Sequence, residues 1–284
     1  MDADLAALID DLPELRGRPV RIQVLTGGLT NLNYRLESGD EVYVLRVPGE
    51  NTAQLGIDRQ IEYASAQAAY RSGAGPEVVA VHSATGAILT RFVAGKTVTT
   101  EDLRSPGLLQ RVVASLKRYH NGTGGGGVFS ALETIHTYCE RAAEYGVEFP
   151  PEVKVAMDRL AFIALEVGNP SRVVPCHNDL LAANFIDDGR QVWVLDWEYA
   201  GSGDLFFDLG NLAANGQFTL EQEMGLLGYY FGRVDQQDLE RLHLMRRLSY
   251  LREAMWGFLQ LGVSKLDFDF RAYGERHLTL FMKS

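Results

Sequence analysis

The chain carries HNDLLAAN at residues 177–184 and LDWE at residues 195–198, and these two stretches constrain its fold more than any others. Phosphoryl transfer requires a carboxylate that orients the acceptor hydroxyl and oxygen ligands that hold Mg²⁺ against nucleotide phosphates. Asp179 is the candidate for the first task. Asn184 and Asp196 are candidates for the second, because amide and carboxylate oxygens suit a hard cation. The two stretches therefore predict a small-molecule kinase.

The residues between these stretches predict a hairpin. Two short apolar runs flank Asp188-Gly189, and an Asp-Gly pair favours chain reversal. A hairpin returns its outer ends to one place, so Asn184 and Asp196 are expected close enough for one metal ion to contact both. A His-x-Asp tripeptide alone can occur by chance in an acidic protein, but the hairpin spacing favours the functional interpretation.

Composition agrees with this class without selecting it. The chain has 284 residues, of which 46% are hydrophobic, and can bury a large core. Its formal net charge of −10 argues against a nucleic-acid partner and leaves room for a cationic substrate. The two cysteines are too few for a disulfide scaffold, and neither a signal peptide nor a membrane-length apolar run is evident. We therefore expect a cytoplasmic protein without membrane insertion; the residues specify no oligomeric state.

The N-terminal part predicts an antiparallel meander with strands at 22–25, 33–36 and 42–47. The first turn contains Gly27, Gly28, Thr30 and Asn31, whose backbone could approach ATP phosphates closely and donate N–H groups to them. Two glycines between strands also fit an ordinary hairpin turn. The turn by itself therefore leaves both interpretations open.

Arg46 favours the nucleotide-binding interpretation. It lies on the third predicted strand, where protein kinases carry a lysine that contacts phosphates and pairs with a helical glutamate. Residues 58–70 predict the helix, and Glu62 is the expected partner. An arginine can replace the lysine because its planar, permanently charged fork suits phosphate and carboxylate together.

Farther along, a hairpin is predicted at 78–90, a hinge that would contact adenine at 91–95, and helices near 105–121, 131–145 and 151–167. The helix near 105–121 has Ser105 and Pro106 as its expected cap and first-turn residues. Gly124 to Gly127 lacks the Lys-Ser/Thr of a phosphate loop, so we expect a flexible connection there.

These motifs, together with FDLGN at 207–211 and the segment 256–273, resemble those of the choline/ethanolamine kinases, a branch of the aminoglycoside-phosphotransferase-like kinases. The resemblance covers nearly the whole chain. It implies an α+β, two-lobed, protein-kinase-like fold: a small antiparallel sheet with one key helix at 1–93, and a larger helical lobe at 94–284. It also implies ATP as co-substrate, Mg²⁺ as the metal, Asp179 as catalytic base, and His177 and Asp208 as structural support.

The acceptor pocket is expected around Trp256, which lies off the apolar stripe of a C-terminal helix and shares its face with Glu253. Its spacing to Tyr273 resembles the aromatic pattern that surrounds choline in the family. A trimethylammonium donates no hydrogen bond, and each ring contributes only about 0.5–2 kcal/mol. Carboxylates must therefore help, and Glu198 and Glu253 are the candidates. The expected acceptor is choline first and ethanolamine second.

Other functions remain open at this stage. Thiamine kinase-like enzymes share the sequence found at residues 196–200, and aminoglycoside phosphotransferases use the same catalytic loop. A nucleotide-binding regulatory module without catalysis would be expected to lack Asp179, Asn184 or Asp196, and all three are present. A hydrolase using His177 as base has no recognisable nucleophile and orienting partner.

Overall fold

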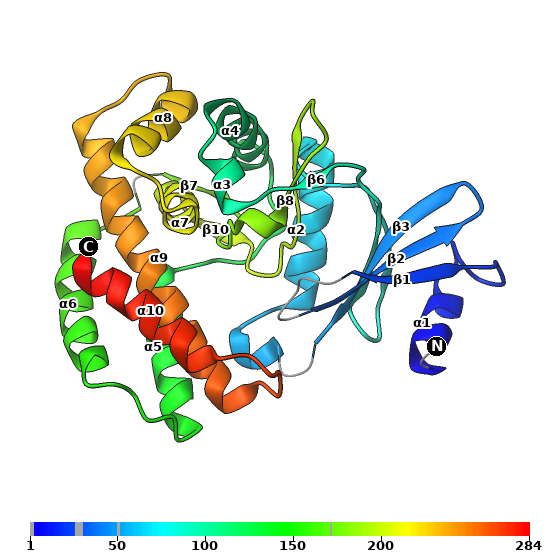
Figure 1. Ribbon diagram of the computed structural model, residues 1–284, viewed down its shortest axis with the longest axis horizontal. Coiled ribbons are helices and arrows are strands. Elements are labelled where there is room, and N and C mark those ends of the chain that lie inside the picture. Colours follow the sequence, from blue (N-terminus) through cyan, green and yellow to red (C-terminus); the bar gives the residue numbers. More distant parts are fainter. Residues whose placement is uncertain (1–2, 26–30, 50–51, 171) are drawn as a thin grey trace.

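The computed structural model describes residues 3–25, 31–49, 52–170 and 172–284. An antiparallel sheet formed by the N-terminal part of the chain faces a larger helical region (Figure 1). The N-terminus lies beside the sheet, and the C-terminus lies among the helices. This arrangement confirms the predicted two-lobed α+β fold.

The sheet contains β1 (Arg21–Leu25), β2 (Asn31–Ser38), β3 (Glu41–Pro48), β4 (Val78–His82) and β5 (Ala87–Arg91), in the order β1-β2-β3-β5-β4. Every neighbouring pair is antiparallel, which confirms the predicted meander and hairpin; the pairing of β3 with β5, which joins the two, was not predicted. The helix α1 (Ala3–Asp11), which the sequence interpretation missed, packs Leu8 and Ile9 against this sheet in a small core with Leu36 and Leu45.

The short helix η1 (Thr52–Leu55) leads to α2 (Arg59–Ser72), the single helix expected in the sheet lobe. Asp58 begins α2 because its side chain accepts hydrogen bonds from the backbone N–H groups of Gln60 and Ile61. Gly73 ends it at φ 73°, a left-handed conformation that suits glycine. The predicted boundaries are correct to within two residues.

The chain enters the helical region through β6 (Lys96–Thr97), which pairs with β8 (Phe185–Asp187). β8 in turn pairs with β9 (Val192–Val194), so the hairpin predicted between Asn184 and Asp196 is confirmed. Gly95 makes this crossing possible, because a Cβ atom there would lie 2.6 Å from the backbone oxygen of Asp187.

The helical region consists of α3 (Thr100–Leu103), α4 (Pro106–His120), α5 (Ala131–Glu144), α6 (Glu152–Val167), α7 (Leu205–Gly216), α8 (Leu220–Phe231), α9 (Gln236–Val263) and α10 (Phe270–Lys283). It also holds the paired strands β7 (Val173–Cys176) and β10 (Gly201–Asp204), which were not anticipated. The helices predicted for α4, α5 and α6 are confirmed. Ser105 occupies the N-cap position of α4, but its side chain makes no capping hydrogen bond.

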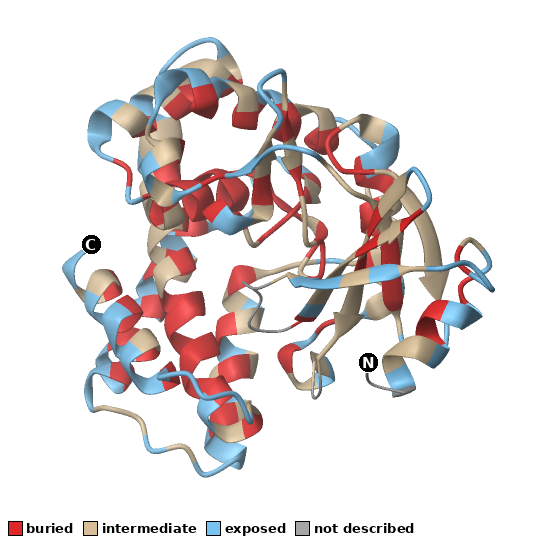
Figure 2. Cartoon of the chain, turned by 45° about the vertical axis from the view of Figure 1, so that its right-hand side comes forward, coloured by how far each residue is buried: buried red, intermediate tan, exposed pale blue. Residues whose placement is uncertain are grey.

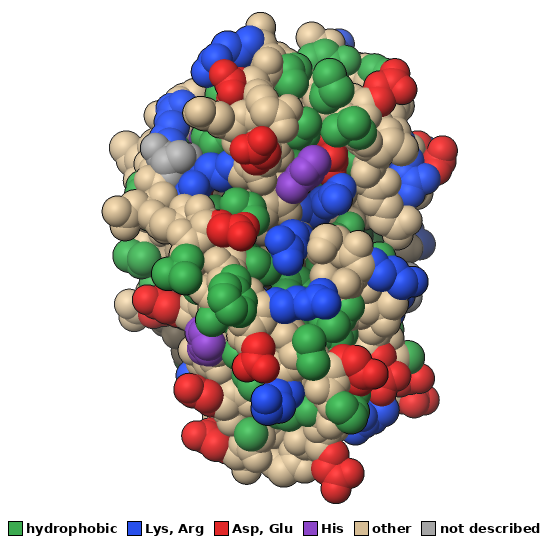
Figure 3. Space-filling model, turned by 90° about the vertical axis from the view of Figure 1, so that its left-hand side faces the viewer, with side chains coloured by type: hydrophobic (Ala, Val, Ile, Leu, Met, Phe, Trp, Pro, Cys, Tyr) green, Lys and Arg blue, Asp and Glu red, His purple; other side chains and the backbone are tan. Residues whose placement is uncertain are grey.

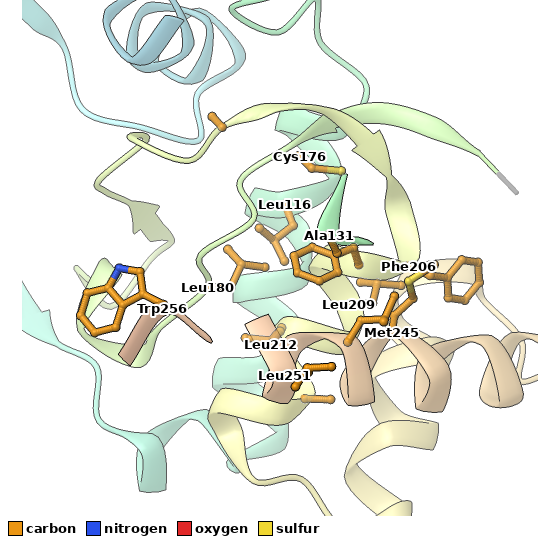
Figure 4. Close-up of a cluster of buried hydrophobic side chains, with 14 of the residues drawn as sticks. Leu116, Ala131, Cys176, Leu180, Phe206, Leu209, Leu212, Met245, Leu251 and Trp256 are labelled. Carbon is orange, nitrogen blue, oxygen red and sulfur yellow. The ribbon is translucent and has the colours of Figure 1, made fainter. Parts of the chain in front are cut away.

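Helix α9 is the centre of the helical lobe. Its predicted apolar stripe is buried, from Met245 through Leu248 and Leu251 to Phe258. The helix is buried on all sides between Leu251 and Gln260, and Figure 2 shows this buried stretch. Trp256 was expected to be presented among polar groups, yet it is only 8% exposed. Figure 4 shows its indole at the margin of the hydrophobic cluster.

Three of the four glycines at 124–127, namely Gly124, Gly125 and Gly127, pack closely against other segments, which corrects the expectation of a flexible connection; Gly126 is exposed, with nothing within 4 Å of a Cβ atom there. A Cβ atom on Gly125 would lie 2.1 Å from the backbone nitrogen of Ser65 in α2, so only glycine fits this approach. Directly after Gly127, Val128 forms a parallel bridge with Ser202. The sequence signal was misleading because close backbone packing and flexibility both favour glycine.

The outer face of the helical lobe mixes basic, acidic and hydrophobic side chains, as Figure 3 shows. On the described residues of this face there is no extended basic surface of the kind that nucleic acids bind. Within the ranges given above, each helix is too short or too polar to cross a bilayer.

Candidate active site

The loop that carries the HNDLLAAN motif is anchored on Asp208 of α7. The Asp208 carboxylate accepts backbone hydrogen bonds from His177, at 2.8 Å, and from Asn178, at 2.6 Å. His120 Nε2 lies 2.9 Å from the same carboxylate. Burial alone would raise the pKa of Asp208, but the hydrogen bonds and neighbouring histidines outweigh it and lower the pKa. Asp208 is therefore ionised and bound by three donors, which supports its proposed structural role.

His177 connects the two motif segments. Its Nδ1 accepts a hydrogen bond from the backbone N–H of Asp179, at 3.2 Å, so Nε2 carries the proton and donates to the carbonyl of Leu195, at 2.8 Å. Burial lowers the pKa of His177, which keeps the ring neutral. The imidazole thus links the backbone of Asp179 to that of Leu195, the residue before Asp196.

Asn184 and Asp196 meet at the open end of the hairpin, as expected. The backbone N–H of Leu195 donates to the carbonyl of Asn184, at 2.8 Å. The Asn184 side-chain amide donates to the Asp179 carbonyl, at 2.9 Å, which leaves its Oδ1 as an acceptor. Asp196 has φ 62°, and among the described residues no donor makes a hydrogen bond to its buried Oδ1. One amide oxygen and one carboxylate oxygen that accepts no hydrogen bond fit Mg²⁺.

Arg46 reaches this pair from the opposite lobe. Its guanidinium forms an ion pair with Glu62 of α2, and its Nη1 lies 3.2 Å from Asp196 Oδ1. The same nitrogen is 3.6 Å from Glu198 Oε2. Arg46 therefore connects the key helix of the sheet lobe with the DWE segment of the helical lobe.

A second arginine, which the sequence interpretation missed, joins the same cluster. Arg59 Nη1 lies 2.5 Å from Glu62 Oε2 and 3.4 Å from Glu198 Oε2. Burial is the main cause that lowers the pKa of Arg59. The available signal was its spacing, because positions three residues apart share a helix face and Arg59 precedes Glu62 by three.

Glu198, a residue expected beside the acceptor, contacts Asn31 and Arg46, which were expected to bind ATP. It is 6% exposed, and it accepts a hydrogen bond from Asn31 Nδ2, at 3.0 Å, besides approaching Arg46 and Arg59. Burial first, and then the neighbouring charge of Asp196, raise its pKa. The other proposed phosphate-loop residues, Gly27, Gly28 and Thr30, lie outside the described residues.

Asp179 is held by an arginine that the sequence interpretation did not include in the site. Arg252 Nη1 of α9 lies 3.0 Å from Asp179 Oδ1. Burial raises the pKa of Asp179 to about 7, although Arg252 acts in the opposite direction. In the described part of the chain, Asp179 Oδ2 accepts no hydrogen bond, whereas Oδ1 accepts that of Arg252.

Arg252 is itself enclosed by the expected acceptor residues. Its Nη1 is 2.5 Å from Glu253 Oε1, and Glu253 Oε2 accepts a 2.5 Å hydrogen bond from the Tyr273 hydroxyl. Its guanidinium lies 4.4 Å from the centroid of the Tyr199 ring. Burial opposes its charge, but Glu253 and Asp179 outweigh burial and raise the pKa of Arg252. The available signal was its place among the polar residues of α9 that share a face with Trp256.

The three expected aromatic and acidic residues of α9 and α10 do come together. Trp256 Nε1 donates to the Tyr199 hydroxyl, at 3.1 Å. The Trp256 and Tyr273 rings meet edge to face, with centroids 5.4 Å apart. Since Glu253 bonds both Tyr273 and Arg252, this group adjoins Asp179 through Arg252.

A cavity of about 240 Å³ lies beside this group. It is bounded by η1, the start of α2, the segment 127–130 and α5, and it touches the site at Glu198 and Tyr199. Asp179 and Trp256 are not among its lining residues. The cavity therefore adjoins Glu198 and Tyr199 without containing Asp179.

His120, Cys176 and Asp208 offer ligand atoms within 4.8 Å of one another, in the way that a metal site would. Their hydrogen bonds argue against that role. His120 bonds both Tyr230 and Asp208, and the Asp208 carboxylate binds the loop backbone through both oxygens. The cluster is therefore a satisfied structural network.

The model for the phosphotransferase enzyme family matches residues 21–245 of this chain. Protein LicA from Haemophilus influenzae is 27% identical over 215 residues, which cover 74% of this chain and 62% of that protein. Ethanolamine kinase 2 from Homo sapiens is 26% identical over 309 residues, which cover 97% of this chain and 79% of that protein.

Solved structures give the same result. The crystal structure of a choline/ethanolamine kinase family protein from Mesorhizobium loti has a TM-score of 0.86 and 30% sequence identity, over 100% of this chain and 94% of that one. Aminoglycoside 2'-phosphotransferase-IIIa shares the fold alone, with a TM-score of 0.69 at 14% identity over 99% of this chain and 98% of that one. On these similarities and the geometry described above, the chain belongs to the phosphotransferase enzyme family and, within it, to the choline/ethanolamine kinase family.

Proposed function

We propose that this chain transfers the γ-phosphoryl group of ATP to the hydroxyl of a small amino alcohol, with choline and ethanolamine as the candidate acceptors. The observation that carries the proposal is the link made by His177, which binds the backbone beside both Asp179 and Asp196. That link brings a base candidate and a metal ligand into one group, and Arg46 reaches the group from the other lobe.

Asp179 is the proposed base. Its Oδ1 is bonded to Arg252, so Oδ2 would accept the hydrogen bond of the acceptor hydroxyl and align its oxygen for in-line attack. The Arg252 contact fixes the rotamer of the carboxylate, and positioning of this kind is a major part of catalysis in phosphoryl transfer. The raised pKa also makes Asp179 a better proton acceptor than an ordinary carboxylate.

Asn184 and Asp196 are the proposed ligands of Mg²⁺, which would neutralise charge on the nucleotide phosphates when bound. Arg46, held by Glu62, would contact the phosphates from the sheet lobe and stabilise the charge that develops on them. Residues 1–93 would then form the nucleotide-binding lobe and residues 94–284 the catalytic and acceptor-binding lobe, with the hinge near 91–95. The names of the relatives, ethanolamine kinase 2 and a choline/ethanolamine kinase family protein, support an amino alcohol as the acceptor.

The test measures ADP release by the purified protein with ATP and Mg²⁺ and with one acceptor at a time: choline, ethanolamine, thiamine or an aminoglycoside. We expect turnover with choline or ethanolamine, and a clearly lower kcat/KM with thiamine and with the aminoglycoside. Turnover confined to thiamine or the aminoglycoside would overturn the acceptor class.

Two variants give the matched comparison. Asp179→Ala is expected to abolish turnover while ATP still binds, because it removes the base and leaves the proposed metal ligands intact. Asp158→Ala, on the exposed surface of α6, should behave as the unmodified protein. Full activity of Asp179→Ala would refute the assignment of the base.

A further inference from the structure

The guanidinium of Arg252 occupies a site with the chemistry of a cation-binding pocket. Two carboxylates, those of Asp179 and Glu253, lie 3.0 Å and 2.5 Å from its Nη1. The face of the Tyr199 ring lies 4.4 Å from its central carbon. Arg252 is 1% exposed, so the protein has enclosed its own cation beside the proposed base.

The ring of Tyr273 is also in contact with other side chains of the protein. The guanidinium of Arg276 lies 5.4 Å from the centroid of the Tyr273 ring, and the imidazole of His277 lies 4.2 Å from it. The hydroxyl of Tyr273 is bonded to Glu253. Little of this ring remains available for a ligand cation.

Trp256 offers little free ring surface either. Its indole is 8% exposed, and the rings of Phe270 and Tyr273 pack against it with centroids 5.8 Å and 5.4 Å away. Its only polar group, Nε1–H, is bonded to Tyr199. The rings of Tyr199, Tyr273 and Trp256 are therefore each already in contact with other side chains of the protein.

A quaternary ammonium depends on ring faces of this kind. It has no N–H group, so it is held by cation–π contacts and by nearby carboxylates that nothing else neutralises. A primary ammonium differs, because its three N–H donors can bond carboxylate oxygens that already accept one other bond. Glu253 and Asp179 can each accept a further hydrogen bond without losing Arg252.

We infer that Arg252 fills the cation site formed by Asp179, Glu253 and the Tyr199 ring and makes the chain selective for a primary amino alcohol over its trimethylated counterpart. The inference rests on the proposed function and reverses the acceptor order expected from the sequence. Arg252 also holds Asp179, so it acts as a positioning residue and as a specificity-determining residue.

The first test compares ethanolamine and choline with the unmodified protein at saturating ATP. We expect kcat/KM for ethanolamine to exceed that for choline by about tenfold or more, which corresponds to the loss of a single ring contact. An equal or higher kcat/KM for choline would overturn the inference. This measurement needs no variant and does not depend on whether a variant folds.

The second test uses Arg252→Gln, with Arg247→Gln as the matched control. Arg247 lies on the same helix and approaches an aromatic ring, that of Phe281, at 5.9 Å and outside the site. Arg252→Gln should lower kcat for both acceptors and shift the preference toward choline by about tenfold, whereas Arg247→Gln should leave the preference unchanged. A uniform loss for both acceptors would show that Arg252 only positions Asp179, and would overturn its role in specificity.

Tetramethylammonium provides a probe that does not require turnover. Calorimetric titration should detect no binding to the unmodified protein and measurable binding to Arg252→Gln, in which the ring of Tyr199 is uncovered. Tight binding to the unmodified protein would overturn the inference even if neither amino alcohol were phosphorylated. Failure of the proposed function and failure of this inference can therefore be distinguished.

Discussion

Replacement of Asp208 by asparagine tests how the catalytic loop is held. The carboxylate is 0% exposed and accepts bonds from the backbone N–H groups of His177 and Asn178 and from His120 Nε2. An asparagine has one acceptor oxygen, so at least one of these donors would face its NH₂ group and remain unpaired. A buried unpaired donor costs about 1–3 kcal/mol, and the charge-assisted part of the remaining bonds is lost as well.

We therefore expect Asp208→Asn to reduce the free energy of unfolding by about 2–4 kcal/mol, a large share of the total stability of an ordinary domain. Urea unfolding followed by circular dichroism at pH 7 measures this change, and the exposed Asp158→Asn serves as control. Activity should fall further than stability, because the loop that carries Asp179 loses its anchor. A loss below about 1 kcal/mol would refute the view that Asp208 organises the loop.

The remaining predictions concern protonation, phosphate binding and packing. Because the pKa of Asp179 is raised from 3.8 to about 7, its carboxyl group binds a proton more tightly in the folded protein than in the unfolded chain. The free energy of unfolding without metal should therefore fall as the pH rises from about 4 to about 7, and stay level above that pH. Asp179→Asn should remove that decline in urea unfolding between pH 5 and pH 8, and parallel profiles for both proteins would contradict the raised pKa. Arg46→Ala should raise KM for ATP and lower kcat/KM by about 100-fold, because a charge-assisted contact to phosphate is worth about 1.5–3 kcal/mol. An unchanged KM for ATP would show that Arg46 does not contact the nucleotide. Gly125→Ala should lower stability by about 1–3 kcal/mol or more through overlap with the Ser65 backbone, while Gly107→Ala, where nothing lies within 4 Å, should have little effect on the melting temperature.

Local patterns predicted several elements accurately. The hairpin between Asn184 and Asp196 was recognisable because a turn pair between short apolar runs leaves few other conformations. Arg46 and Glu62 could be paired because their places on the third strand and on the following helix resemble those of the lysine and glutamate of protein kinases. The burial of the Met245 to Phe258 stripe followed from helical periodicity.

The errors share a physical cause. Arg59 and Arg252 each look like ordinary polar helix residues, and nothing local indicates the carboxylates that surround them. Gly125 was misinterpreted because the sequence does not show that α2 lies against it. Strands β7 and β10 were missed because each is only four residues long and is defined by its distant partner.

The sequence by itself determined the family, a phosphotransferase, because Asp179, Asn184 and Asp196 stand at a characteristic spacing around a hairpin. The tertiary structure alone decided how charge is distributed around them. Arg252 is buried beside Asp179 because packing brings α9 against the loop at residues 177–184. The carboxylates of Asp179 and Glu253 offset the free-energy cost of desolvating its guanidinium. Arg252 and Asp179 are 73 residues apart in the sequence, and only the packing of the folded chain brings their side chains into contact.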